Sequence, residues 1–201
     1  MKSPKAVLAT LLMAAAVSNG CIFSPGTTGP ASKKPYVAPS SPYSVIQNIT
    51  ALYINRDFAK YDETLSQDYV FRFIPDNAGH SDSLIRNQEI DFSEHLFSTG
   101  STDGLQAAAA KISLAIDTTS SSPDNRVGKE GWIRYYVQTN LTITLPDGQV
   151  TPVQSPAYFF FKQEPAGSGV WKLAEWQDVQ TSAAPRVNPM LAFNSSPAPR
   201  D

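Results

Sequence analysis

The chain has 201 residues, a formal net charge of −2 and a single cysteine. This mildly acidic balance, with no basic stripe along the sequence, argues against nucleic acid as a partner. The length suits one domain with its own core, and a lone cysteine excludes a disulfide within the chain.

The first 20 residues have the pattern of a secretory signal peptide. Lys2 and Lys5 give a basic start, and the apolar run 6–17 is too short to cross a bilayer comfortably. Gly20 and Cys21 follow. This ending resembles the lipobox of bacterial lipoproteins, which implies that Cys21 is lipidated and anchors the chain in the membrane. The alternative is an ordinary secretory signal with an incidental cysteine.

The resemblance also implies a location. Because Ile22 rather than aspartate follows the cysteine, it favours the outer membrane of a bacterial envelope, facing the periplasm. Residues 21–41 are rich in proline, serine and glycine, so we expect the lipidated cysteine and a disordered tether there. Residues 182–201 predict a Pro-rich mobile tail, which leaves residues 42–181 as the folded domain.

Helical signals come first in the domain. Ser41 followed by Pro42 predicts a helix start, and apolar residues at helical spacing continue to Tyr53. Asp57 is expected to cap a second, shorter helix, ahead of an aromatic strand over residues 69–74. A third helix is predicted from Asn87, with three inward residues, Ile90, Leu96 and Phe97.

Strand signals dominate the rest. Residues 112–116 predict a short strand followed by a polar loop, and residues 132–145 alternate strictly between apolar and polar side chains. The turn at residues 146–148 predicts a hairpin whose return strand reaches Lys162, with Pro152 and Pro156 in an edge or bulge. A last strand is expected over residues 170–179. Helices followed by long hairpins indicate an α+β fold, with the helices on one face of an antiparallel sheet.

Three stretches carry a family resemblance: residues 49–71, the EHLF segment at 94–97, and residues 169–179. They resemble the nuclear transport factor 2-like superfamily, which includes SnoaL-like domains. The resemblance implies a cone-like curved antiparallel sheet packed on about three N-terminal helices, with a pocket inside. That fold hosts isomerases, dehydratases, cyclases and non-catalytic domains, so it assigns no reaction by itself.

In the enzymes of that superfamily, Asp, His and Tyr side chains in the cone perform acid–base chemistry. The resemblance therefore makes Asp178, His95 and Tyr53 the candidate catalytic residues, because a carboxylate in an apolar pocket can be tuned into a base. We also expect Arg72 to reach Asp178, where a structural ion pair is the simpler interpretation. The expected pocket wall includes Tyr69, Arg72 and Trp176. No metal-ligand spacing or cofactor fingerprint occurs, so no metal and no cofactor are predicted.

Two functional hypotheses follow. The first is a lipid-anchored, non-catalytic domain of the cell envelope that binds a small apolar ligand or takes part in assembly. The alternative is a SnoaL-like envelope enzyme, an isomerase, dehydratase or hydrolase, that performs acid–base chemistry on a small apolar carbonyl compound. The wet face of the long hairpins also allows a homodimer, and that face includes Arg134, Tyr136, Gln138 and Asn140.

Overall fold

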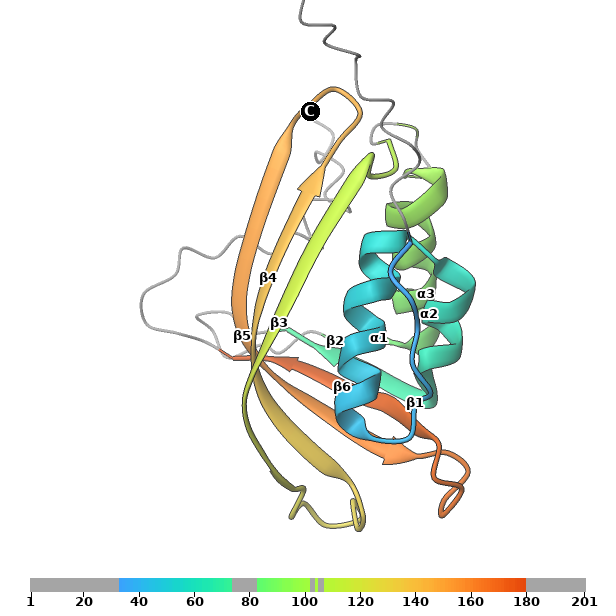
Figure 1. Cartoon of the computed structure of the whole chain (residues 1–201), viewed down its shortest axis with the longest axis vertical. Helices are drawn as coiled ribbons and strands as arrows, with labels where there is room; N and C mark the ends of the chain where they lie inside the picture. The colour runs from blue at the N-terminus through green and yellow to red at the C-terminus, as the bar shows by residue number, and fades with distance from the viewer. Residues whose placement is uncertain (1–32, 74–82, 102–103, 105–106, 180–201) are drawn as a thin grey trace, which may run out of the picture. The chain divides into compact units, whose positions relative to one another are not determined.

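A computed structural model of the chain describes residues 33–73, 83–101, 104 and 107–179. The described part is an α+β domain in which the helices lie on one side of a curved, six-stranded sheet (Figure 1). This confirms the predicted fold class. The helices are α1 (Pro42–Asn55), α2 (Phe58–Thr64) and α3 (Arg86–Glu94), which continues as the π-helix η1 (His95–Thr99). The strands are β1 (Leu65–Arg72), β2 (Ser83–Ile85), β3 (Lys111–Pro123), β4 (Ile133–Thr144), β5 (Val150–Gln163) and β6 (Trp171–Asp178).

The sheet order is β2-β1-β6-β5-β4-β3. Every pair is antiparallel except β1 with β6, which runs parallel and joins the first and last strands of the domain. That contact places the α2–β1 corner beside the C-terminal strand. A parallel pair needs a long crossover connection, and here the whole α3–β5 segment supplies it.

The start of α1 matches its sequence signal. Ser41 is the N-cap, Pro42 occupies the first turn, and Ser41 and Ser44 cap each other reciprocally. Asp57 caps α2 as predicted, its carboxylate accepting a hydrogen bond from the Lys60 backbone. Local side chains therefore set both helix starts.

The region before α3 differs from the prediction. The chain forms the short edge strand β2 and enters α3 at Arg86, one residue before the expected cap at Asn87. The backbone N–H of Ile85 is satisfied by the Gln88 side chain at 3.0 Å, so a residue inside the helix caps it. A strand of three residues is too short to leave an alternating pattern.

The strand at Ile112 is much longer than predicted. It continues to Pro123 through the Ser/Thr run that was expected to be a loop, and it pairs with β4 along its length. The short polar side chains of this run fit a pleated, half-exposed surface. Because strand preference depends strongly on neighbouring strands, pairing with β4 makes this segment a strand. The hairpin turn after β4 is confirmed, with Gly148 at φ 87. β6 pairs with β5 only from Ala157 onward, so Pro152 and Pro156 lie in the half with one neighbouring strand, as expected.

Residues 33–40, which the sequence interpretation placed in the tether, lie along α1 in an extended conformation, and we call them the strap. The Asn48 amide exchanges two hydrogen bonds with the Val37 backbone, at 2.9 and 2.8 Å, and Asn55 does the same with Lys34. Pro39 accepts a hydrogen bond from the Trp171 backbone at 2.8 Å. Side-chain amides therefore replace the backbone partners that a strand would have. The expected signal peptide, Cys21 and the C-terminal tail lie outside the described residues.

Candidate functional site

The inner side of the sheet encloses a small cavity of about 60 Å³ against α3 and η1. Three of the predicted site residues, Tyr53, Trp176 and Asp178, line it together. The other lining side chains are mainly apolar and come from β1, α3, η1, β3, β4 and β5. They are Phe71, Phe92, Leu96, Leu114, Thr139, Leu141, Ile143, Val153 and Ser155.

Asp178 is the acidic residue of this cavity. It ends β6 on the same face as Trp176, whose indole Nε1 donates a hydrogen bond to Oδ1 at 3.1 Å. Burial raises the pKa of Asp178 to about 6, although the indole hydrogen bond acts in the opposite direction. A carboxyl group with this pKa can accept or release a proton near neutral pH.

A second buried carboxyl, missed from the sequence, belongs to Glu89 on α3. Its side chain is fully buried, and Oε1 accepts hydrogen bonds from the Tyr61 hydroxyl at 2.7 Å and the Ser93 hydroxyl at 3.3 Å. Oε2 has no hydrogen-bond partner among the described residues. Burial raises the pKa of Glu89 to about 7, and the two hydrogen bonds lower it by less.

Three buried tyrosines surround Glu89. The rings of Tyr53 and Tyr61 meet edge to face at 5.4 Å, and burial followed by the charge of Glu89 raises the pKa of both hydroxyls. Tyr69 is also fully buried, and its hydroxyl has no partner among the described residues. Burial, then Glu89, and more weakly Asp178 raise the Tyr69 pKa, so Tyr69 lies within the electrostatic reach of both carboxyls.

The remaining predicted residues lie away from the cavity. Arg72 is on the outer face of the sheet, where Nε contacts Glu175 at 2.9 Å, so the expected pair with Asp178 does not form. Alternation along β1 explains this, because Tyr69 and Phe71 face inward and Arg72 faces outward. His95, at the start of η1, lies 3.9 Å from Asp91 and does not line the cavity.

The outer face has its own charged cluster around Arg126. The guanidinium contacts Asp124 at 2.7 Å and Glu175 at 3.1 Å, and it lies 3.9 Å from the centre of the Phe160 ring. Both carboxylates are buried, so Arg126 and Arg72 neutralise charges that would otherwise be costly. This cluster fixes the loop after β3 onto the sheet.

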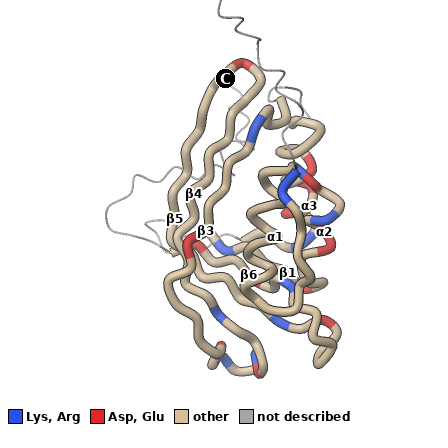
Figure 2. Tube along the Cα trace, viewed as in Figure 1, with Lys and Arg blue, Asp and Glu red and all other residues tan. Residues whose placement is uncertain are grey.

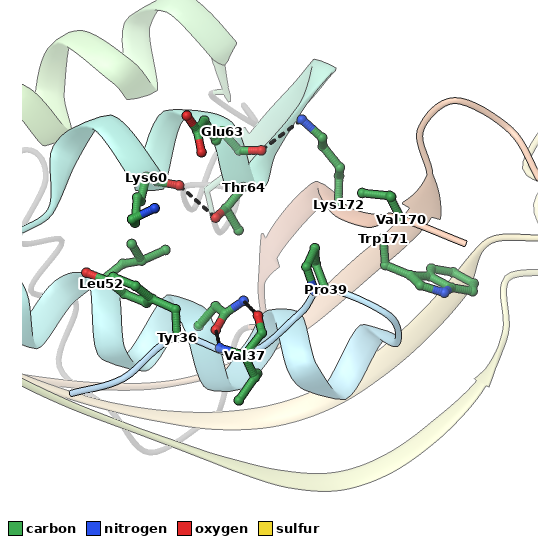
Figure 3. Close-up of a pocket in the computed structure, with 11 residues that line it drawn as sticks. Tyr36, Val37, Pro39, Leu52, Lys60, Glu63, Thr64, Val170, Trp171 and Lys172 are labelled. Carbon is green, nitrogen blue, oxygen red and sulfur yellow. Dashed lines mark hydrogen bonds between the residues drawn. The ribbon is translucent and has the colours of Figure 1, made fainter. Parts of the chain in front are cut away.

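A larger, open pocket of about 420 Å³ lies between the strap, α2 and the start of β6, and we call it the strap groove (Figure 3). Its walls combine apolar and aromatic side chains with two lysines, Lys60 and Lys172, and one acid, Glu63. The Lys172 ammonium donates to the Glu63 backbone carbonyl at 2.8 Å, and Lys60 lies 5.4 Å from the centre of the Tyr36 ring. Neither ammonium forms an ion pair with a carboxylate of the described residues.

The described residues include no group of three or more His, Cys, Asp or Glu side chains that could hold a metal ion. No helix among them is long and apolar enough to cross a membrane.

No family model matches the chain, and no curated protein matches it. Among solved structures, a conserved protein from Planctomyces limnophilus is 13% identical, with a TM-score of 0.52 over 68% of this chain and 94% of that one. Naphthalene 1,2-dioxygenase with indole in its active site is 11% identical, with a TM-score of 0.52 over 71% of this chain and 78% of that one. At these identities the likeness concerns the fold alone.

Sequence reasoning found Asp178 because it borders Trp176 in a strand, but it had no signal for Glu89. A glutamate in a helix with weak apolar spacing is normally solvent-exposed. Hydrogen bonds from the nearby Ser93 and the distant Tyr61 make its burial tolerable, and only the packing of α3 against α2 brings Tyr61 to it.

Proposed function

We propose that this chain is a lipid-anchored protein of the bacterial cell envelope whose cone-like domain is non-catalytic and acts through binding or assembly. The observation that carries the non-catalytic part is the filled interior. Phe71, Phe159 and Trp176 pack with ring centres 5.6 and 4.4 Å apart, and only about 60 Å³ stays open beside them. Ligand pockets usually measure about 300–1,000 Å³.

The anchor rests on Cys21 and its resemblance to a lipobox. The test is the intact mass of the protein extracted from membranes, compared with a Cys21→Ala variant. A mature chain that begins at acylated Cys21, with the variant unprocessed or released from the membrane, is the expected result. An unmodified cysteine in the mature protein, or cleavage elsewhere, contradicts the anchor.

A ligand that enters the cone should be small and mostly apolar, with one hydrogen-bond donor that faces Asp178. At about 60 Å³ the cavity has the volume of roughly two water molecules, so such a ligand must displace side chains such as Leu96. Leu96→Ala should therefore enlarge the cavity and permit binding of indole, measured by ligand-observed NMR. The Leu96→Ala/Asp178→Asn double variant tests whether the carboxylate orients the bound molecule.

The second candidate function is acid–base catalysis on a small carbonyl compound. It is favoured by Asp178 and Glu89, whose pKa values are raised to about 6 and about 7 on the inner side of the sheet. The test is exchange of the α-protons of cyclohexanone in deuterated buffer. We expect no exchange above the buffer rate. Exchange that Asp178→Asn abolishes would overturn the non-catalytic proposal.

We also propose a homodimer through the outer face of β3–β5. β4 and β5 each carry one charged residue, and their upper lengths are almost free of charge in Figure 2. Nearer the Ile133 end of β4, Tyr136 and Tyr158 contact each other at 5.1 Å, and Arg134 lies over the Tyr158 ring at 5.0 Å. Tyr158→Glu should shift the mass measured by sedimentation equilibrium from dimer to monomer, and a monomeric parent protein would contradict this proposal.

A further inference from the structure

The strap groove is the larger of the two pockets described above, and neither ligand binding inside the cone nor the acid–base reaction uses it. It opens on the surface, where Tyr36 of the strap faces Lys60 of α2 and Lys172 of β6 reaches to the Glu63 backbone (Figure 3). Two apolar side chains on the rim of the groove are exposed to solvent. Val37 is 44% exposed and Val170 is 40% exposed. An apolar rim around two lysines suits a partner that is apolar and anionic at once.

The groove has a fixed wall. The strap is tied to α1 by the amides of Asn48 and Asn55, and the Tyr36 hydroxyl donates to Asp57 at 2.7 Å. The Trp171 backbone donates to Pro39 and joins the strap to β6. Because these contacts hold both sides of the groove, a partner would meet a preformed surface and pay little ordering entropy.

The groove also lies where the chain enters the domain. The strap begins at Lys33, and Cys21 precedes it by 12 residues. A chain of this length spans at most about 40 Å even when fully extended. An anchor at Cys21 therefore keeps the strap, and the groove beside it, close to the bilayer surface.

We propose that the strap groove docks on the membrane by binding the headgroups of anionic phospholipids. This rests on the proposed anchor, which supplies proximity, while the groove supplies affinity and orientation. Lys60 and Lys172, joined by Lys33 and Lys34 of the strap, attract anionic phosphates. Tyr36 and Trp171 are the residue types that settle at the level of the headgroups, and Val37 and Val170 reach toward the acyl boundary.

Acidic side chains near the groove weaken this attraction and provide a control of opposite sign. Glu63 lines the groove and is exposed, whereas the Asp57 carboxylate is engaged by Tyr36. If the surface binds anionic lipid, Glu63→Gln should strengthen the contact and reversal of the lysines should abolish it. A purely apolar contact would respond to neither change.

The experiment couples the full chain through its only cysteine to a maleimide-bearing lipid in vesicles. This anchors the domain whether or not the cell lipidates Cys21, so failure of docking and failure of natural lipidation are separate results. Tryptophan emission is quenched by lipids with brominated acyl chains, in vesicles of phosphatidylcholine alone or of equal parts phosphatidylcholine and phosphatidylglycerol. Trp171→Phe identifies the contribution of the groove.

We expect tryptophan quenching only in the vesicles that contain phosphatidylglycerol. We also expect Trp171→Phe to lose this quenching. In Lys60→Glu/Lys172→Glu it should fall to about a fifth or less, and in Glu63→Gln it should rise. The matched control, Lys111→Glu/Lys129→Glu, makes the same charge change elsewhere and should leave quenching unchanged. Equal quenching in the groove variant and the control, or quenching that phosphatidylcholine alone supports, overturns the proposal. So does quenching that survives Trp171→Phe in full.

Discussion

Glu89 has its carboxyl group fully buried under α3, and this burial raises its pKa from 4.5 to about 7. Between these two values the unfolded chain releases a proton that the folded chain keeps. The free energy of unfolding therefore falls as pH rises from about 4.5 to about 7, by up to about 3 kcal/mol. Asp178, with a pKa of about 6, adds a decline that ends nearer pH 6.

Glu89→Gln should remove most of this pH dependence, because glutamine does not titrate. The fold should tolerate the change, because a glutamine Oε1 can still accept the Tyr61 hydrogen bond. We expect the variant to exceed the parent protein in free energy of unfolding by about 1–3 kcal/mol at pH 8, and by much less at pH 5. Urea denaturation at several pH values measures this difference. Glu94→Gln, at an exposed position at the end of α3, is the control. Parallel pH profiles for parent and Glu89→Gln would contradict the assignment.

The tyrosines around Glu89 offer a matched pair. The Tyr61 hydroxyl donates to Glu89, so Tyr61→Phe should destabilise the fold by about 1–3 kcal/mol. The Tyr69 hydroxyl is buried with no partner among the described residues, so Tyr69→Phe should be neutral or stabilise by up to about 1 kcal/mol. Thermal and urea unfolding of both variants compares them directly. Equal losses would mean that a buried water satisfies Tyr69.

Among the elements, the loop after β3 depends on one guanidinium. Burial favours the neutral form of Asp124, but the hydrogen bonds from Arg126 outweigh it and lower the pKa of that carboxyl. Arg126→Met keeps an apolar contact with Phe160 and leaves Asp124 without its cation. We expect a loss of about 2 kcal/mol, reduced from the fully buried case because Arg126 is partly exposed.

The control for this loop is Arg134→Met, since Arg134 is exposed and hydrogen-bonds only Ser122 among the described residues. Its cost should stay below about 0.5 kcal/mol. Hydrogen exchange of residues 124–132 should also rise in Arg126→Met alone. An Arg126→Met variant as stable as Arg134→Met would show that the aromatic contact, not the charge, holds the loop.

Elements with local signals were predictable from sequence, and elements that depend on distant partners were not. Ser41 and Asp57 cap their helices through neighbours three residues away, and the alternation in β4 reflects a single buried face. The far half of β3 is a strand because β4 lies beside it, although its Ser/Thr composition is typical of loops. Asp178 was found at the cavity, whereas Glu89 needed the packing of α3 to be recognised.

At the scale of the whole molecule, the strap is the part of the domain that amino-acid composition predicted least well. A Pro- and Lys-containing stretch is typical of a linker, yet residues 34 and 37 are held by Asn55 and Asn48 of α1. Two asparagines that face an extended segment give no periodic signal. Residues 33–40, ahead of the helix cap, therefore pack as part of the folded domain.

Two shortened chains test how much the strap contributes to stability. A chain that begins at Lys33 keeps every strap contact and should match the full chain within about 0.5 kcal/mol. A chain that begins at Ser41 loses the strap and leaves the Asn48 amide, only 9% exposed, without its partners. Because an unsatisfied buried amide costs about 1–3 kcal/mol and the contacts of Pro39 and Tyr36 are lost as well, we expect a loss of at least about 2 kcal/mol.

Asn48→Ala in the full chain separates the strap from the effect of a new chain end. It should reproduce about half of the loss and increase hydrogen exchange at residues 36–38, while Asn55→Ala, whose hydrogen bonds are exposed, should change stability less. If the chain that begins at Ser41 is as stable as the chain that begins at Lys33, the strap contributes no net free energy. The strap would then be ordered by α1 without stabilising α1 in return. In that case the strap would not be a firmly held wall of the strap groove.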